Sequence, residues 1–207
     1  MNPQNQNDIS HLEPEVLEML EAAENMKNEQ RFEEAITILQ AIVLEYPECV
    51  EAYEEIGDNY MSLREVDKAE KALRHALKIN PESANTHYLL GFLFSLQHKW
   101  DNSVKELQKA DHLFPNHPEI LRCLGWSIYN CNRQSQGIAV LERSQNLSPN
   151  DVNIMCDLGV CYMTSQKREQ AKIIFEKVVK AAPDSDQARE CKMFIELLSK
   201  KPEQPES

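Results

Sequence analysis

The chain has 207 residues, of which 42% are hydrophobic and 27% charged, and its formal net charge is −12. This acidic balance disfavours nucleic acid or an anionic membrane as the main partner, because phosphate recognition needs clustered lysine and arginine. The sequence contains no apolar stretch of about 20 residues, the length that a membrane span requires, so we expect no membrane insertion.

Residues 1–13 are polar and rich in amides, and we predict that they form a disordered tail. They contain no apolar run of the kind found in a signal peptide or an anchor. A cytoplasmic location is therefore expected.

A 34-residue period begins after this tail. Five prolines follow one another at that interval: Pro47, Pro81, Pro115, Pro149 and Pro183. Four of the five glycines stand ten residues after the first four of these prolines: Gly57, Gly91, Gly125 and Gly159. A fixed period with punctuating prolines and small residues is typical of arrays of helix–turn–helix units.

Each period has the apolar spacing of two helices. Tyr53, Ile56 and Tyr60 recur at steps of three and four, as do Ala69, Leu73 and Ala76 further on. A proline cannot continue the helix before it, so each pair should end there. The small-residue position of the second helix holds Ala69, Ser103, Gly137 and Ala171.

The sequence therefore predicts five helix pairs, in residues 14–47, 48–81, 82–115, 116–149 and 150–183. One more amphipathic helix is expected over residues 184–200, where it would cap the open end of the array and present its polar side to water. Residues 201–207 should form a second disordered tail.

This pattern resembles the tetratricopeptide repeat family, with five repeats over about residues 15–183. The resemblance implies an all-α fold, a right-handed α-solenoid of tandem helix–turn–helix repeats. It also implies that the first helices of the repeats line a concave surface that holds a ligand.

On that surface the register places residues that the core positions do not use. They begin as acidic residues and become aromatic along the chain, and tryptophan, tyrosine and arginine are frequent binding anchors. The predicted peptide-binding residues are Glu51, Glu54, Asp58, Tyr88, Phe92, Arg122, Trp126, Tyr129 and Asn130. Packing between repeats and self-association are the alternative roles for the four aromatic residues among them.

The family includes modules that grip a carboxylate with lysine and asparagine, and this chain does not match them. Glu54 and Asp58 occupy the corresponding positions of the second repeat and would repel a carboxylate. The expected ligand is instead a peptide or helix with apolar anchors, carrying lysine or arginine near the second repeat.

Nothing in the sequence indicates catalysis. The six histidines are dispersed, no Cys-x-x-Cys motif occurs, and there is no glycine-rich phosphate loop. We expect a non-enzymatic protein without cofactor or metal, acting as an adaptor or assembly factor for a protein or peptide partner. A secretion or folding chaperone that shields an aggregation-prone client is the alternative function. A homodimer formed through the same groove, and a thiol or metal sensor using Cys123, Cys131, Cys156 and Cys161, also stay open.

Overall fold

The computed structural model describes residues 12–200, and within this range all regular secondary structure is helical, as predicted. Of the two predicted tails, residues 1–11 and 201–207 lie outside the described residues. Eleven helices are present in the described range: α1 (Pro14–Asn28), α2 (Phe32–Glu45), α3 (Val50–Ser62), α4 (Val66–Ile79), α5 (Ala84–Leu96), α6 (Trp100–Leu113), α7 (Pro118–Asn130), α8 (Gln134–Leu147), α9 (Val152–Thr164), α10 (Arg168–Ala181) and α11 (Asp186–Ser199). None of the helices described is both long enough and apolar enough to cross a membrane.

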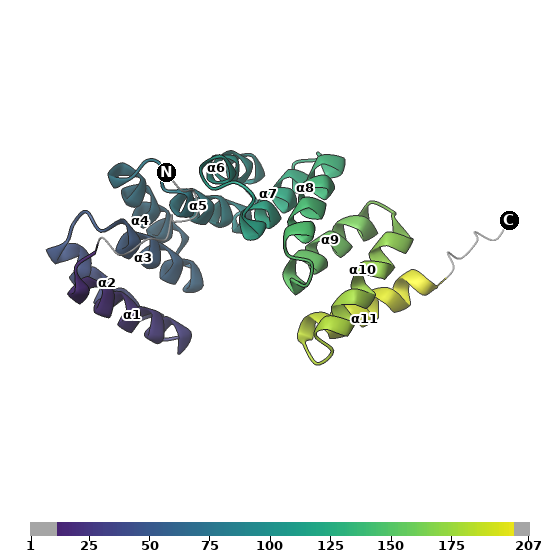
Figure 1. Ribbon diagram of the computed structural model, residues 1–207, viewed down its shortest axis with the longest axis horizontal. Coiled ribbons are helices and arrows are strands. Elements are labelled where there is room, and N and C mark those ends of the chain that lie inside the picture. The colour runs from purple at the N-terminus through teal and green to yellow at the C-terminus, as the bar shows by residue number, and fades with distance from the viewer. Residues whose placement is uncertain (1–11, 201–207) are drawn as a thin grey trace. The chain divides into compact units, whose positions relative to one another are not determined.

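The chain divides after Pro115 into two compact units, called unit 1 (up to Pro115) and unit 2 (from Asn116). Unit 1 contains three helix pairs, α1–α2, α3–α4 and α5–α6, and the first helices α3 and α5 contact each other (Figure 1). Unit 2 contains the pairs α7–α8 and α9–α10, followed by α11. In unit 2, α9 contacts both α7 and α11, so three successive first helices lie side by side.

The 34-residue period is the period of the core. One large side chain of each second helix is completely buried: Leu39, Leu73, Leu107, Leu141 and Phe175. Each such burial contributes roughly 1.5–3 kcal/mol relative to exposure. All of them except Leu39 pack on a glycine of the first helix, and a Cβ atom at Gly159, for example, would lie 2.4 Å from Phe175. The glycines therefore set how closely the two helices of a pair approach.

Two departures from the small-residue pattern have structural reasons. The hydroxyl of Ser103 donates a 2.7 Å hydrogen bond to the carbonyl of Gly91, so this serine ties α6 to α5. A Cβ atom at Gly137 would lie 2.6 Å from both the carbonyl oxygen of Gly125 and the backbone nitrogen of Tyr129. Helix α8 thus lies against the backbone of α7 at a position where other repeats carry alanine or serine.

The turn between the two helices of a pair has the same backbone conformation in all five pairs. A residue with φ near +60° follows every first helix of a pair, at Gln30, Arg64, His98, Asn132 and Gln166. The next backbone N–H closes the helix end, as in the 2.8 Å bond from Glu65 to the carbonyl of Tyr60. This is the left-handed helix termination in which glycine is the usual residue. At these five turns other residues adopt it.

Candidate ligand-binding faces

Glu54, one of the predicted site residues, links two repeats. It is 7% exposed and accepts hydrogen bonds from Ser83 Oγ at 2.7 Å, from Asn85 Nδ2 at 2.8 Å and from the hydroxyl of Thr86. All three donors lie at the start of α5, whereas Glu54 lies on α3. Its carboxylate is therefore satisfied inside unit 1.

Asp58 is also paired within unit 1. Lys27 Nζ of α1 lies 2.5 Å from Asp58 and 2.8 Å from Glu55. Burial alone would lower the pKa of Lys27, but its hydrogen bonds with Asp58 and Glu55 outweigh this effect and the pKa is raised. A basic ligand residue opposite Glu54 and Asp58 would meet carboxylates that already have partners. Glu51, one turn before Glu54, is half-buried, and its carboxylate lies 3.7 Å from Cys49 Sγ.

Tyr88 and Phe92 form an aromatic pair on α5. Their rings stack with centroids 6.3 Å apart, and both side chains are half-buried against the core of unit 1. Leu96, one turn further along α5, is 53% exposed. We call these three residues of α5 the aromatic stripe of unit 1.

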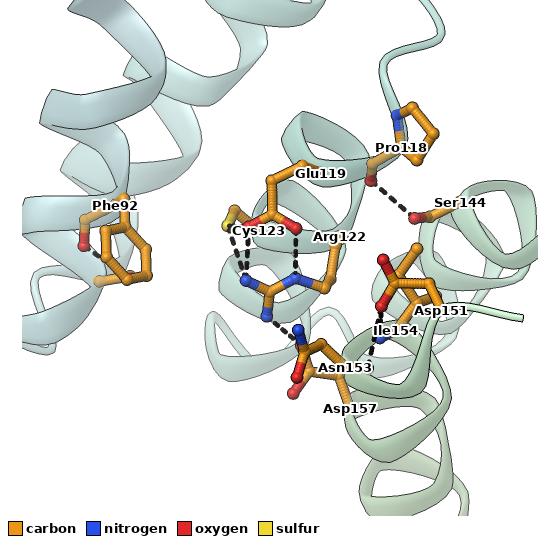
Figure 2. Close-up of polar contacts among 11 residues, drawn as sticks. Phe92, Pro118, Glu119, Arg122, Cys123, Ser144, Asp151, Asn153, Ile154 and Asp157 are labelled. Atoms are coloured by element: carbon orange, nitrogen blue, oxygen red, sulfur yellow. Dashed lines mark hydrogen bonds and ion pairs between the residues drawn. The ribbon is translucent and has the colours of Figure 1, made fainter. Parts of the chain in front are cut away.

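Arg122 is held by two carboxylates in unit 2. Its Nε and Nη2 donate to Glu119 at 2.8 and 2.6 Å, and its Nη1 donates to Asp157 of α9 at 2.7 Å (Figure 2). Burial lowers the pKa of Arg122, but the hydrogen bonds with Glu119 and the nearby negative charges raise it overall. Burial raises the pKa of Asp157 in spite of the arginine. This network joins α7 to α9.

The other two polar groups predicted on α7 are engaged within unit 2. The hydroxyl of Tyr129 lies 3.2 Å from the carbonyl of Cys161, 2.7 Å from Thr164 Oγ1 and 2.9 Å from Ser165 Oγ. The ring of Tyr129 is buried in the unit 2 core. The amide of Asn130 donates to the carbonyl of Trp126 at 2.8 Å.

Trp126 belongs to an apolar row that crosses three helices. It is half-buried, and the residues 34 and 68 positions later, Val160 on α9 and Phe194 on α11, are half-buried as well. A second line runs beside it, with half-buried Met163 and with Leu197 at 57% exposure. We call these five residues (Trp126, Val160, Met163, Phe194 and Leu197) the unit 2 apolar row.

Four members of this row were not among the predicted site residues. They can be found from the sequence by adding 34 and 68 to the positions of Trp126 and Tyr129, which leads from α7 to α9 and then to α11. Phe194 also packs inward, since its ring centroid lies 5.2 Å from that of Phe175.

Three of the four cysteines proposed for a sensor, Cys123, Cys156 and Cys161, lie in environments that favour the neutral thiol because burial raises their pKa. Burial raises the pKa of Cys156 and of Cys161 to about 12. Thiolates are the reactive and metal-binding form of cysteine, so these side chains are weak nucleophiles. Between residues 12 and 200, no three histidine, cysteine or acidic side chains are grouped as metal ligands would be.

Comparison with known proteins gives consistent results. Tetratricopeptide repeat models match residues 28–93 and 152–185. Among solved structures, TTC0263 of Thermus thermophilus is 15% identical with a TM-score of 0.76, over 86% of this chain and 98% of that one. YrrB, described as a TPR protein with an unusual peptide-binding site, is 19% identical with a TM-score of 0.63, over 84% of this chain and 90% of that one.

A third structure is the APC/C hetero-tetramer Cut9-Hcn1, with 14% identity and a TM-score of 0.80 over 88% of this chain and 36% of that one. The comparison with curated proteins gives no match. At these identities the structural likeness concerns the fold, which is the all-α repeat fold that the period predicted. The repeat models and the regular succession of helix pairs show that the chain belongs to the tetratricopeptide repeat family.

Proposed function

We propose that this protein is a non-enzymatic adaptor or assembly factor that holds an apolar segment of a protein partner on the unit 2 apolar row. The observation that carries the proposal is the repetition of apolar side chains at one register position of three adjacent helices, Trp126, Val160 and Phe194. Other residues already fill the core positions of these helices, such as Leu124 and Leu158.

The charges around the row support an uncharged ligand surface. Arg122, the nearest predicted cationic anchor, is engaged by Glu119 and Asp157. A ligand charge placed over the apolar side chains of Val160 and Met163 would lose water, which is unfavourable. We therefore drop the lysine or arginine expected in the ligand and propose apolar residues at helical or extended spacing.

Tetratricopeptide repeat proteins bind protein partners, and two of the similar solved structures are examples. YrrB has a peptide-binding site, and Cut9 forms a hetero-tetramer with Hcn1. Their low identity to this chain transfers neither ligand. They support only the general class, an interaction module rather than a catalyst.

A chaperone would use the same row differently. Methionine adapts its shape to varied apolar partners, and Met163 lies on α9, the middle helix of the row. A chaperone client should aggregate when released, whereas an adaptor's partner should stay folded by itself. Light scattering of the released partner separates these two functions.

The test uses Val160→Asp, which places a charge in the middle of the row. The matched control is Ile173→Asp, because Ile173 is 53% exposed on α10 and is not part of the row. A phage-displayed library of random 16-residue peptides is selected on the wild-type protein, and enriched peptides are synthesised and titrated by calorimetry. We expect apolar peptides whose Kd rises at least about tenfold with Val160→Asp and is unchanged with Ile173→Asp.

Enrichment of charged peptides only, or equal affinities for both variants, would contradict the proposal. A homodimer through the row is tested in parallel by light scattering without peptide. A dimeric wild type that becomes monomeric with Val160→Asp would show that the row is covered by a second copy of the chain instead.

A further inference from the structure

His87 occupies a core position that is apolar in the following repeats. The residues 34 and 68 positions later are Leu121 and Met155, both buried. His87 itself is 5% exposed, on the first turn of α5. A polar ring is costly at such a position unless both of its nitrogens find partners.

Both nitrogens of this ring face oxygen atoms. Nδ1 lies 2.7 Å from a carboxylate oxygen of Glu106 on α6, and Nε2 lies 3.1 Å from the carbonyl oxygen of Pro81 in the turn before α5. A carbonyl oxygen can only accept a hydrogen bond. The hydrogen bond from His87, supported by Lys109, lowers the pKa of Glu106, so this carboxyl is ionised and also accepts.

A neutral imidazole carries one N–H and would turn a lone pair toward one of these two oxygens. The observed arrangement therefore needs a hydrogen atom on each ring nitrogen. We propose that His87 is a proton-dependent clamp: its charged form ties the start of α5 both to α6 and to the Pro81 turn, and loss of its proton releases one of the two ties.

The surroundings identify what such a release would change. On the α6 side the charged groups are Glu106 and Lys109, which lie 3.1 Å apart. On the α3 side Glu54 binds Ser83, Asn85 and Thr86, the residues just before His87. With one tie of the clamp broken, the first turn of α5 depends more heavily on Glu54.

The consequence reaches the aromatic stripe of unit 1. Tyr88 follows His87 directly, and Phe92 stacks on Tyr88 one turn later. Because one of the two ties needs the second ring proton, the order of this stripe depends on the protonation of His87. This inference is independent of the proposed function of unit 2.

Hydrogen–deuterium exchange of the full chain tests the clamp. Wild type, His87→Leu and the control His112→Leu are compared at pH 6 and pH 8, with rates corrected for the intrinsic pH effect. His112 is an exposed histidine of α6. In wild type and in His112→Leu, we expect the protection factors of residues 82–92 to fall between pH 6 and pH 8. In His87→Leu this fall should be smaller by a factor on the order of ten, as expected for one lost charge-assisted hydrogen bond.

Nitrogen NMR of the wild-type ring provides a readout that does not depend on the variant folding. At pH 6, both ring nitrogens of His87 should carry hydrogen and correlate with it. An equal pH effect in wild type and His87→Leu, or a single N–H on His87 at pH 6, would overturn the proposal.

Discussion

Arg122 of α7 and Asp157 of α9 form a 2.7 Å ion pair between the first helices of two successive repeats. Glu119 holds the other side of the same guanidinium at 2.6 Å. The arginine thus separates two carboxylates that would otherwise repel each other across the helix contact. Burying such a network costs desolvation free energy, but removing its cation destabilises the fold further because the carboxylates stay buried without a partner.

Arg122→Ala should therefore lower the free energy of unfolding by about 2–3 kcal/mol at pH 7, because two half-buried carboxylates lose their partner. Asp157→Asn is the matched change, since it keeps an oxygen for Arg122 and removes a charge. It should cost less than about 1 kcal/mol. Urea denaturation of both variants measures the difference, and equal losses would contradict this account.

The same pair predicts a pH dependence. The pKa of Asp157 is raised in the folded protein, so folding favours its protonated form and stability from this group falls as pH rises through that pKa. Without Arg122 this penalty grows. The stability deficit of Arg122→Ala should accordingly shrink between pH 7 and pH 4.5, and a deficit that stays constant would show that the lost contacts are not electrostatic.

Gly137 gives a prediction opposite to helix propensity. Alanine is favoured over glycine inside a helix by about 1 kcal/mol. At Gly137 a Cβ atom would meet backbone atoms of α7, which cannot rotate away as a flexible side chain can. We expect Gly137→Ala to destabilise the protein by about 1–3 kcal/mol in urea denaturation.

The reciprocal control is Ala171→Gly, in the same position of the next repeat, where only propensity and a buried methyl are lost. It should also destabilise. Stabilisation by Gly137→Ala, the outcome expected from propensity alone, would mean that α7 and α8 separate easily.

How much the sequence could predict depends on the kind of contact. The helices and the buried positions follow from periodicity alone, as Leu73, Leu107 and Leu141 illustrate. The hydrogen bonds of Glu54 could not be predicted, because its three donors lie in the first turn of the next repeat and the register of one helix does not reveal contacts between repeats. The same holds for Tyr129, because its hydroxyl forms hydrogen bonds with residues at the C-terminal end of α9 in the next repeat.

The left-handed turns could not be predicted from the sequence for another reason: glycine, the residue that usually marks such a turn, is absent there. Arg64 has φ of 60° and is exposed between α3 and α4. This conformation costs about 1–2 kcal/mol for a residue with a Cβ atom, whereas glycine loses about 0.5–1 kcal/mol through unfolded-state entropy. Arg64→Gly should therefore stabilise the protein by up to about 1 kcal/mol.

Thermal and urea unfolding measure that gain. Lys71→Gly is its control, because Lys71 is exposed within α4 and has ordinary helical geometry. It should lose about 1 kcal/mol. Two variants that are destabilised alike would show that the turn carries no strain.

Helix α11 differs from the first helices before it at the positions on which a second helix packs. In α9 these positions are Met155, Leu158, Gly159 and Tyr162, all buried. The residues 34 positions later in α11 are Arg189, Lys192, Met193 and Glu196, all exposed. Charged side chains thus keep in water the face that earlier first helices bury.

Replacing the charged residues of this α11 face by the apolar residues found in α9 should make the face associate with other molecules. In Lys192→Leu/Glu196→Tyr, the two new side chains flank Met193, which is already 64% exposed, and form a contiguous apolar face of the kind that drives association. We expect concentration-dependent self-association by light scattering, with the helix content unchanged by circular dichroism. Glu176→Leu/Lys180→Tyr adds the same side chains one turn apart on the exposed side of α10 and should keep the mass of wild type. If the α11 variant also keeps that mass up to high protein concentration, the charges of α11 are not what holds its outer face in water.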